Sequence, residues 1–318
     1  MDKSLQVVLL GIPALDIVAH FSEFPGPDEH RPLHELHTIP GGPACNIATL
    51  LARLGAEVTL LGKVGQDIFG DEIISALEAE GINLPDFRAD GIKTTTVLEL
   101  IEKDKDGGEK SKRSFSHFAA AELSAKAITD LSQKPIDILF LDGIVALGER
   151  AFKEAIKAAD KILAEQDPLV ACDPNLRVGD ELPAWMRERI NELLKYCQFI
   201  VLNKREASLL TGVENYQKAA NELFSANPNL QLLAITLGAQ GAFLQRKHEN
   251  KTYKRLKVPA REVAVADSSG AGDTFTASLL FDWLQKLDLK KAAQLATSRA
   301  AQVVKRPGAW SALPKDFS

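Results

Sequence analysis

The sequence is poor in cysteine and has no large excess of one sign of charge. Its three cysteines, Cys45, Cys172 and Cys197, form no C-x-x-C pair. So small and odd a number argues against a disulfide framework or a zinc ribbon, and it favours a reducing compartment. The net charge of −5 at pH 7 excludes a global basic field of the kind that attracts nucleic acid. We therefore expect no nucleic-acid partner.

Long apolar runs are also missing. The run that precedes Gly11 and Pro13 is shorter than the roughly 7–15 apolar residues of a signal-peptide core and the 18 or more of a membrane span. This run is better interpreted as a buried first strand. The sequence therefore predicts a cytoplasmic protein without a membrane partner.

What the sequence does contain is a regular alternation of strand and helix patterns. The chain has 318 residues, of which 45% are hydrophobic and 25% charged, and this suits one large α/β domain. Short apolar runs that end in Gly, Asp or Asn predict parallel strands covered on both faces. These runs are Val7–Leu10, Val58–Leu61, Ile138–Leu141, Leu169–Cys172, Phe199–Leu202 and Leu232–Thr236.

Helical patterns lie between these runs, at Ala44–Leu54, Phe69–Glu80, Ala151–Gln166, Ala184–Tyr196 and Tyr216–Phe224. The alternation predicts a doubly wound, mostly parallel sheet flanked by helices. In such sheets, ligands bind at the carboxyl ends of the strands. We expect a single domain spanning residues 1–318.

Two segments interrupt the alternation. Residues 14–40 are rich in Pro and His and have no strong helical period. Within residues 94–118, the turn signal Asp106-Gly107-Gly108 separates two β-rich arms, which is typical of a hairpin. Together the segments predict a small β-sheet beside the main domain. Such a sheet is either a lid that excludes water from a substrate or an exposed hairpin without a role in binding.

The most informative stretch is Asp267–Phe275, which reads DSSGAGDTF and precedes a pattern typical of an amphipathic helix. Gly270, Ala271 and Gly272 thus lie at a helix N-terminus, where small residues and free N–H groups suit an anion. Asp273 falls in the first helical turn, where the helix dipole stabilises a carboxylate. Beside an anion hole, this carboxylate can accept the proton of a substrate hydroxyl as its oxygen attacks phosphorus. The alternative is that Asp273 only begins the helix.

Two familiar phosphate-binding motifs do not fit this stretch. It lacks the Gly-Lys-Ser/Thr ending of a Walker A loop. It also lacks the third glycine of a dinucleotide fingerprint, and it lies near the end of the chain instead of after the first strand.

Asp267–Phe275 resembles the C-terminal signature D-T-x-G-A-G-D-x-F of the PfkB/ribokinase family of sugar and nucleoside kinases, with Ser268 in place of the usual Thr. A second signature of that family is similar to Gly41–Asn46, which reads GGPACN, followed by Gly62–Gly70. Further similar pieces are Gly11–Asp16, Asp173–Arg177, Asn203–Glu206 and Thr236–Gly241. The resemblance covers essentially the whole chain. It implies a ribokinase-like fold and an ATP-dependent kinase, with Asp273 as the catalytic base.

The resemblance also implies a substrate site. Asp16 fits the position of the family's Asp that binds substrate hydroxyls, and one carboxylate can accept two hydroxyl hydrogens. Gly42 and Asn46 match the substrate-binding Gly-Gly loop and helix start, and a plain helix-entry residue is the alternative for Asn46. Asp142, at the end of a central strand, is a further candidate for a hydroxyl contact.

Nucleotide and metal sites follow in the same way. Asn203 and Glu206 match the N-x-x-E motif that organises Mg²⁺ through water, and a surface helix start is the alternative. Thr236, Gly238 and Gly241 match the turn that holds the nucleotide. Arg177, in a D-P-N-x-R piece found in fructokinase-like and ketodeoxygluconate-kinase-like members, is a candidate for phosphate contact or a solvated Arg. For members that bind a monovalent cation such as K⁺, the matching residues are Asp267, Ser269, Val303, Arg306 and Gly308.

The sequence says less about substrate and partners. A sugar or sugar acid is the preferred substrate, and a nucleoside kinase or a catalytically silent sugar-binding homologue are the alternatives. The family often dimerises through its lid sheets, so a homodimer is implied by the resemblance only. His30, His34 and His37 lack the H-E-x-x-H spacing of a metal site and have no cysteine nearby. We do not expect them to bind a metal.

Overall fold

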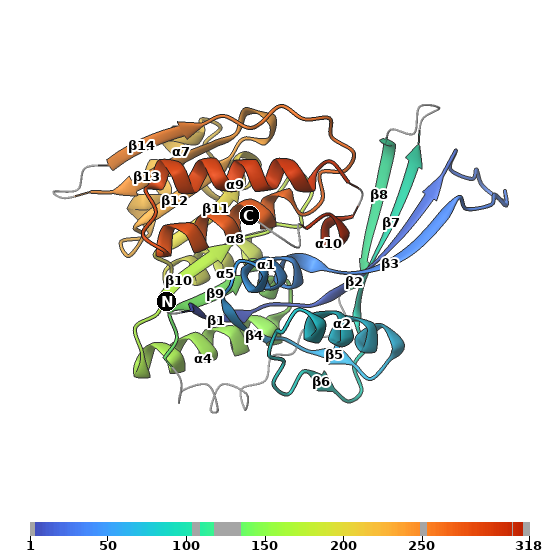
Figure 1. Ribbon diagram of the computed structural model, residues 1–318, viewed down its shortest axis with the longest axis horizontal. Helices are drawn as coiled ribbons and strands as arrows, with labels where there is room; N and C mark the ends of the chain where they lie inside the picture. Colours follow the sequence, from blue (N-terminus) through green and yellow to red (C-terminus); the bar gives the residue numbers. More distant parts are fainter. Residues whose placement is uncertain (1–3, 104–108, 118–134, 249–252, 307, 314–318) are drawn as a thin grey trace.

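The computed structural model describes residues 4–103, 109–117, 135–248, 253–306 and 308–313. Residues 104–108 and 118, which belong to the second predicted lid segment, lie outside the described residues. Two sheets dominate the molecule, a large one inside the main body and a small one standing off it (Figure 1). No helix among the described residues is long and apolar enough to cross a membrane.

The large sheet has eight strands in the order β14-β13-β12-β11-β10-β9-β1-β4. The six strands from β12 to β4 are parallel, whereas β13 and β14 are antiparallel and form one edge. The predicted doubly wound, mostly parallel sheet is confirmed. The strands are β1 (Gln6–Leu10), β4 (Glu57–Leu61), β9 (Ile138–Asp142), β10 (Leu169–Asp173), β11 (Phe199–Asn203), β12 (Leu232–Thr236), β13 (Ala242–Lys247) and β14 (Tyr253–Val258).

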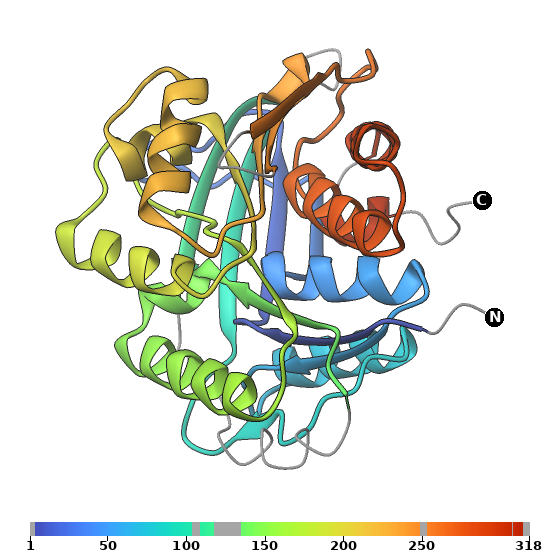
Figure 2. The ribbon, with the colours of Figure 1, turned by 90° about the vertical axis from the view of Figure 1, so that its left-hand side faces the viewer.

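Helices cover both faces of this sheet (Figure 2). Each group of helices shares an apolar core with one face of the sheet, since the strands alternate their side chains between the two faces. One face carries α4 (Glu149–Glu165), α5 (Ala184–Leu194), α6 (Lys204–Thr211) and α7 (Tyr216–Ala226). The other carries α1 (Gly42–Arg53), α2 (Ile68–Ala79), α8 (Ala271–Leu284) and α9 (Leu289–Val303).

Helix α8 differs from the amphipathic helix expected from the sequence. Every residue from Asp273 to Leu280 is buried, because α8 packs against α1, α9 and the sheet at once. Apolar residues continue beyond the last helical residue, Leu284, but the next of them, Leu287, is exposed. The central position of α8 holds its first turn rigidly against the strand ends.

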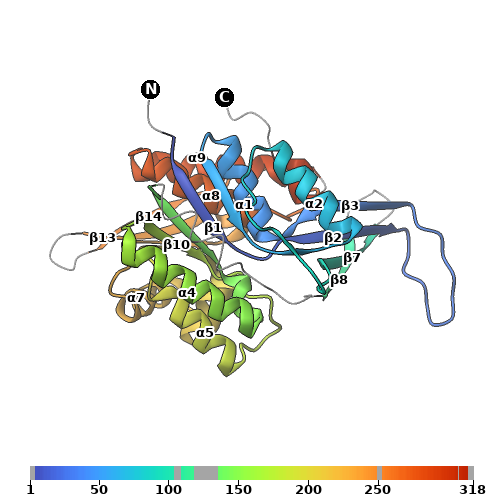
Figure 3. The same ribbon diagram turned by 90° about the horizontal axis from the view of Figure 1, so that it is seen from below.

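The small sheet has the order β3-β2-β7-β8 and extends away from the main body (Figure 3). Its strands are β2 (Ala14–Phe21), β3 (Glu35–Gly41), β7 (Thr95–Lys103) and β8 (Glu109–His117). Strands β2 and β7 pair in parallel, whereas β2–β3 and β7–β8 are antiparallel. The two interrupting segments therefore meet in one sheet. A separate two-stranded sheet pairs β5 (Val64–Gly65) with β6 (Arg88–Ala89).

Two local features fix the ends of these elements. Arg53 in the last turn of α1 donates two hydrogen bonds to Glu80, at 2.5 and 2.8 Å, and one to the carbonyl oxygen of Leu313 at 2.7 Å. Gly143 follows β9 and begins a short 3-10 helix, Gly143–Leu147. A Cβ atom at Gly143 would collide with the backbone of Pro174. The loops after β9 and β10 are thereby packed directly against each other, at the carboxyl edge of the sheet.

Candidate active site

The predicted site residues gather at the carboxyl edge of the large sheet. Asp142 and Asp173 are the last residues of β9 and β10, and they are direct neighbours in the strand register. Asn203 and Thr236, which end β11 and β12, form the next such pair. Because parallel strands end at the same edge, side chains from four separate stretches of sequence meet there.

The first turn of α8 faces this edge. Gly270 caps the helix with a φ of 74°, a left-handed conformation that favours glycine. A Cβ atom on Gly272 would meet nothing within 4 Å, so the space beside the turn is open. The first N–H groups of a helix have no partner inside the helix and carry the positive end of its dipole. This turn can therefore hold an anion.

Asp273 lies in that turn and is 7% exposed. The amide nitrogen of Asn46, on α1, donates a hydrogen bond to its Oδ2 at 2.7 Å. Burial raises the pKa of Asp273, while the bond from Asn46 and the positive charge of Arg177 act in the opposite direction. A carboxylate whose pKa is moved toward neutrality is a better proton acceptor for a hydroxyl.

Three more acids share this buried region. Burial raises the pKa of Asp142 to about 7, and the charge of Asp273 acts in the same direction. Its Oδ1 accepts hydrogen bonds from the Ile144 N–H at 3.2 Å and from the Asn175 side chain at 3.5 Å. Its Oδ2 is buried without a hydrogen-bond partner among the described residues. An orphaned buried carboxyl oxygen of this kind is available to a ligand hydroxyl.

Asp173 and Glu206 interact strongly with each other. Burial and then the charges of Glu206 and Asp273 raise the pKa of Asp173 well above its ordinary value. Glu206 accepts backbone N–H bonds at 2.8 and 2.9 Å, which favour its ionised form, although burial raises its pKa. The pKa is therefore raised more strongly at Asp173, whose Oδ2 accepts a hydrogen bond from the Thr276 hydroxyl at 2.8 Å.

Arg177 is exposed and forms no hydrogen bond or ion pair with a described residue. Its positive charge opposes the effect of burial, which raises the pKa values of Asp142, Glu206 and Asp273. A planar cation with free donors beside the anion-holding turn suits phosphate oxygens.

The pair Asn203 and Glu206 forms a complete capping box at the start of α6. The Asn203 side chain accepts from the Glu206 N–H at 2.9 Å, and the Glu206 carboxylate accepts from the Asn203 N–H at 2.8 Å. The sequence left open a surface helix start or a functional pair. In the structure the pair does begin a helix, yet Glu206 is buried at 6% exposure, which is unusual for a surface cap.

The turn after β12 holds the other predicted nucleotide residues. Thr236 ends β12, and Gly238 begins a short 3-10 helix, Gly238–Gln240. Gly238 and Gly241 have φ angles of 59° and 92°, which favour glycine. A Cβ atom on Gly241 would also collide with the backbone of Val258. This turn lies beside Asn203 through the β11–β12 register.

On the side of the small sheet, Asp16 and the Gly-Gly loop lie together. A Cβ atom on Gly41 would collide with the Asp16 carboxylate, so these two residues are in close contact. Gly42 has a φ of 79° and begins α1, which carries Asn46. Burial raises the pKa of the Cys45 thiol, and the charges of Asp16 and Asp142 add to that effect. Both carboxylates therefore lie near Cys45, one from each sheet.

The five residues predicted for a monovalent cation also lie close together. The Asp267 carboxylate accepts N–H bonds from Ser269 and Gly308, both at 2.8 Å. The Val303 carbonyl oxygen accepts the Arg306 N–H at 3.2 Å in the turn that leads to Gly308. Asp267 and Ser269 come just before Gly270 in the chain, so this group adjoins the start of α8.

Sequence reasoning missed three residues of this site. Asp173 and Asn175 belong to the D-P-N-x-R piece, but only Arg177 was selected from it. Asn175 has a φ of 46°, a left-handed conformation that asparagine adopts more readily than most residues other than glycine. Thr276 is one helical turn beyond Asp273 and bonds Asp173 across 103 residues. The polar Thr within an apolar helix was the available signal.

Comparison with known proteins gives a consistent result. The pfkB family of carbohydrate kinases matches residues 4–316 of the chain. A probable fructokinase-6, chloroplastic, of Arabidopsis thaliana is 30% identical over 290 residues, which cover 86% of this chain and 72% of that protein. A nucleoside kinase of Methanocaldococcus jannaschii is 25% identical, and the match covers 98% of this chain and 94% of that protein.

Among solved structures, an Arabidopsis thaliana ribokinase in complex with ribose and ATP superposes with a TM-score of 0.76. It is 21% identical to this chain, and the match covers 99% of this chain and 97% of the ribokinase. At that identity, the likeness establishes the fold. The expected ribokinase-like fold is thereby confirmed.

Proposed function

The chain belongs to the pfkB family of carbohydrate kinases, which are phosphotransferases with an alcohol group as acceptor, and from this premise we propose that it transfers the γ-phosphoryl group of ATP to a hydroxyl of a small sugar. The observation that carries the proposal is the buried Asp273 carboxylate in the first turn of α8, next to open space at Gly272. A proton acceptor and an anion-holding helix end thus lie in one turn.

The substrate binds between the two sheets in this proposal. Asp16 and Gly42 bind it from the small-sheet side, while Asn46 and Asp142 bind it from the main body. The orphaned Oδ2 of Asp142 supports a hydroxyl contact, because a buried acceptor gains most when a donor fills it. Asn46 has two tasks, since its amide nitrogen already holds Asp273 and its Oδ1 is buried without a partner among the described residues.

ATP binds across the neighbouring strand ends. Thr236, Gly238 and Gly241 hold the nucleotide, Asn203 adds a side-chain contact, and Arg177 contacts phosphate oxygens. The mutual position of Asn203 and Thr236 in the strand register supports this assignment. That an ATP complex is known for the related ribokinase fold supports the choice of nucleotide.

The metals follow from the donor set. Glu206 is buried and already accepts two backbone N–H bonds, so it fits a Mg²⁺ ion held through water better than direct coordination. When bound, Mg²⁺ supplies charge neutralisation on the phosphates. K⁺ would be held by Asp267, Ser269, Val303, Arg306 and Gly308, because hydrogen bonds bring Ser269 and Gly308 to Asp267 and place Arg306 beside the Val303 carbonyl oxygen.

The chemical step uses residues already placed. The Asp273 carboxylate accepts the proton of the substrate hydroxyl while that oxygen attacks the γ-phosphorus and the bond to the leaving ADP breaks. In this proposal the N–H groups of Gly270 and Gly272 and the Arg177 guanidinium stabilise the charge that develops on the transferred group. The N–H of Ala271, the third residue of this turn, donates to the Ser268 carbonyl at 3.4 Å and would have to exchange that long bond for one to the phosphoryl oxygen. The small sheet acts as a lid that excludes water.

A nucleoside is the second candidate substrate, favoured by the similarity to the archaeal nucleoside kinase. A catalytically silent sugar-binding homologue is the third reading, and the intact acid cluster argues against it.

We also propose a cytoplasmic location and a homodimer through the small sheet. Leu36 and Leu98 expose apolar side chains there, on the face opposite Asp16, which favours a second copy as the partner.

The test is a coupled ADP-release assay with Mg-ATP against ribose, fructose, ketodeoxygluconate, tagatose, adenosine and other nucleosides. With the substrate that turns over, Asp273→Asn should lower kcat by about 10²–10⁴ and leave the KM for ATP nearly unchanged. Asp180→Asn, an exposed acid outside the site, is the matched control. Near-normal turnover in a folded Asp273→Asn protein would show that another group is the base. Binding of a sugar without any turnover would favour the silent homologue.

A further inference from the structure

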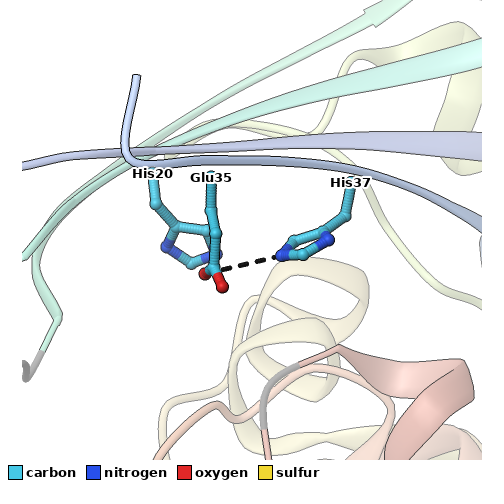
Figure 4. A group of neighbouring side chains, drawn as sticks. All are labelled: His20, Glu35 and His37. Carbon is cyan, nitrogen blue, oxygen red and sulfur yellow. Dashed lines mark ion pairs between the residues drawn. The ribbon is translucent and has the colours of Figure 1, made fainter. Parts of the chain in front are cut away.

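Three side chains of the small sheet gather away from the acid cluster. Among the described residues, His20, Glu35 and His37 form the single group of three potential metal ligands whose ligand atoms all lie within 4.8 Å of one another. They come from the neighbouring strands β2 and β3 and point to the same side of the sheet (Figure 4). The sequence analysis weighed His37 together with His30 and His34, which are not members of this group.

The strand register explains why these three meet. His20 is paired with Glu35 across the antiparallel ladder, so their side chains are direct neighbours on one face. His37 is two residues along from Glu35 and shares that face, because side chains alternate with a period of two. In the sequence, His20 and His37 are too far apart for any local motif, and only the pairing of β2 with β3 brings them together.

The geometry is close to that of a metal site. A tetrahedral Zn²⁺ with bonds of about 2.0–2.1 Å holds its ligand atoms about 3.3 Å apart. The Glu35 carboxylate and His37 Nε2 are 3.4 Å apart already, and the rings of His20 and His37 are 6.2 Å apart between centroids. His20 is buried and therefore fixed, whereas Glu35 and His37 are exposed and can rotate to close the remaining distance.

From this arrangement we propose that His20, Glu35 and His37 bind a divalent transition-metal ion, with Zn²⁺ as the best fit. Two imidazoles and one carboxylate are a donor set that zinc uses with a fourth position left to water or another ligand. The two exposed ligands leave a path for the ion to enter. The ion would join β2 to β3 at the outer end of the small sheet.

The location adds a consequence for the lid. Asp16 and His20 are four residues apart on β2, so they share a face of the small sheet at a distance of about 13 Å. The bound ion would thus lie on the same face as the proposed substrate contact and would fix the outer half of that face. The proposal does not depend on the kinase assignment, since metal binding is measured without nucleotide or sugar.

The test is isothermal titration of ZnCl₂ into the untagged, metal-stripped full chain. We expect one Zn²⁺ per chain and a loss of affinity of at least about 100-fold in His37→Gln, since even outer partners of a metal cost about 10–100-fold. Glu35→Gln should also lose affinity. His30→Gln is the matched control, because this exposed histidine lies on the same β2–β3 connection outside the group, and it should bind like the wild type.

A second measurement guards against misfolding. Zn²⁺ binds the native state and should raise the Tm of the wild type and of His30→Gln, but not that of His37→Gln. Both substituted ligands are exposed, so the unliganded Tm should change little. Equal Zn²⁺ affinity in the wild type and His37→Gln, or no saturable binding by the wild type, overturns the proposal. An equal loss in His30→Gln would show scattered surface binding and would overturn it as well.

Discussion

Replacement of Asp142 with asparagine removes an acid that is fully buried at the end of β9. Asparagine has nearly the same shape and keeps an oxygen for the Ile144 N–H and the Asn175 amide. Its amide nitrogen is a donor, like the hydroxyl of the protonated carboxyl group. The substitution therefore holds the site permanently in a neutral form, and any difference in stability reports the cost of ionising Asp142 in the fold.

The size of that cost follows from the pKa. The neutral form is favoured in the folded protein, where the pKa of Asp142 is raised from its ordinary value of 3.8 to about 7. Between these two pH values Asp142 is ionised in the unfolded chain and neutral in the folded one. The free energy of unfolding of the wild type therefore falls by about 1.4 kcal/mol for each pH unit. The loss accumulates to about 4 kcal/mol above pH 7. It is absent below the unfolded pKa.

The assay is urea unfolding of both proteins from pH 5 to pH 8. Asp142→Asn should be more stable than the wild type by about 1.5 kcal/mol at pH 5 and by about 4 kcal/mol at pH 8. The neighbouring acids add nearly the same slope to both proteins. Asp180→Asn at an exposed position should differ from the wild type by less than about 0.5 kcal/mol at every pH. In the proposed function, the stabilised variant loses a hydroxyl contact and becomes a poorer kinase.

Two outcomes would refute this reasoning. A difference that is constant from pH 5 to pH 8 would mean that Asp142 does not titrate as its burial requires. A variant less stable than the wild type at all pH values would mean that the carboxyl has a partner in the fold that asparagine cannot keep.

Two further predictions concern the packing. Arg53→Ala should lower the free energy of unfolding by about 3 kcal/mol, because it leaves the half-buried Glu80 and the Leu313 carbonyl without their donor. Urea unfolding measures this loss, and Arg53→Lys should recover only part of it. An unchanged stability in Arg53→Ala would contradict the role of the Arg53–Glu80 pair. Gly143→Ala should cost about 1–3 kcal/mol and shift the Tm downward, since its Cβ would overlap the backbone of Pro174; a Tm equal to that of the wild type would show that the loop moves aside freely.

The central strands and most helices follow from the sequence because their physics is local. The central parallel strands are buried on both faces and so show as apolar runs, such as Ile138–Leu141 in β9. The edge strand β14, with sequence YKRLKV, was not predicted, because its exposed side chains are mostly charged and hide the strand pattern. The amphipathic pattern assigned to α8 is wrong since helices cover the side expected to face water.

The same distinction between local and long-range features applies to the site residues. Gly270 to Asp273 were predicted since a glycine turn before a helix carries its chemistry in consecutive residues. The contact of Asn46 with Asp273 spans 227 residues, and no spacing rule could reveal it. The raised pKa of Asp173 depends on its burial and on the charges of Glu206 and Asp273, and the meeting of His20 with His37 depends on strand register. Packing decides these features, and sequence patterns do not record it.

The strand order also determines when the first strands can pair during synthesis. Strand β1 lies between β4 and β9, and the register pairs Val7 with Ile138. In the small sheet, Ala14 of β2 pairs with Thr95 of β7. During synthesis, β2 therefore keeps one edge unpaired until β7 has left the exit tunnel, and β1 keeps one edge unpaired until β9 has left it. A pause in translation before β7 has emerged would prolong the exposure of both strand edges, and unpaired edges of this kind are prone to pair with other chains.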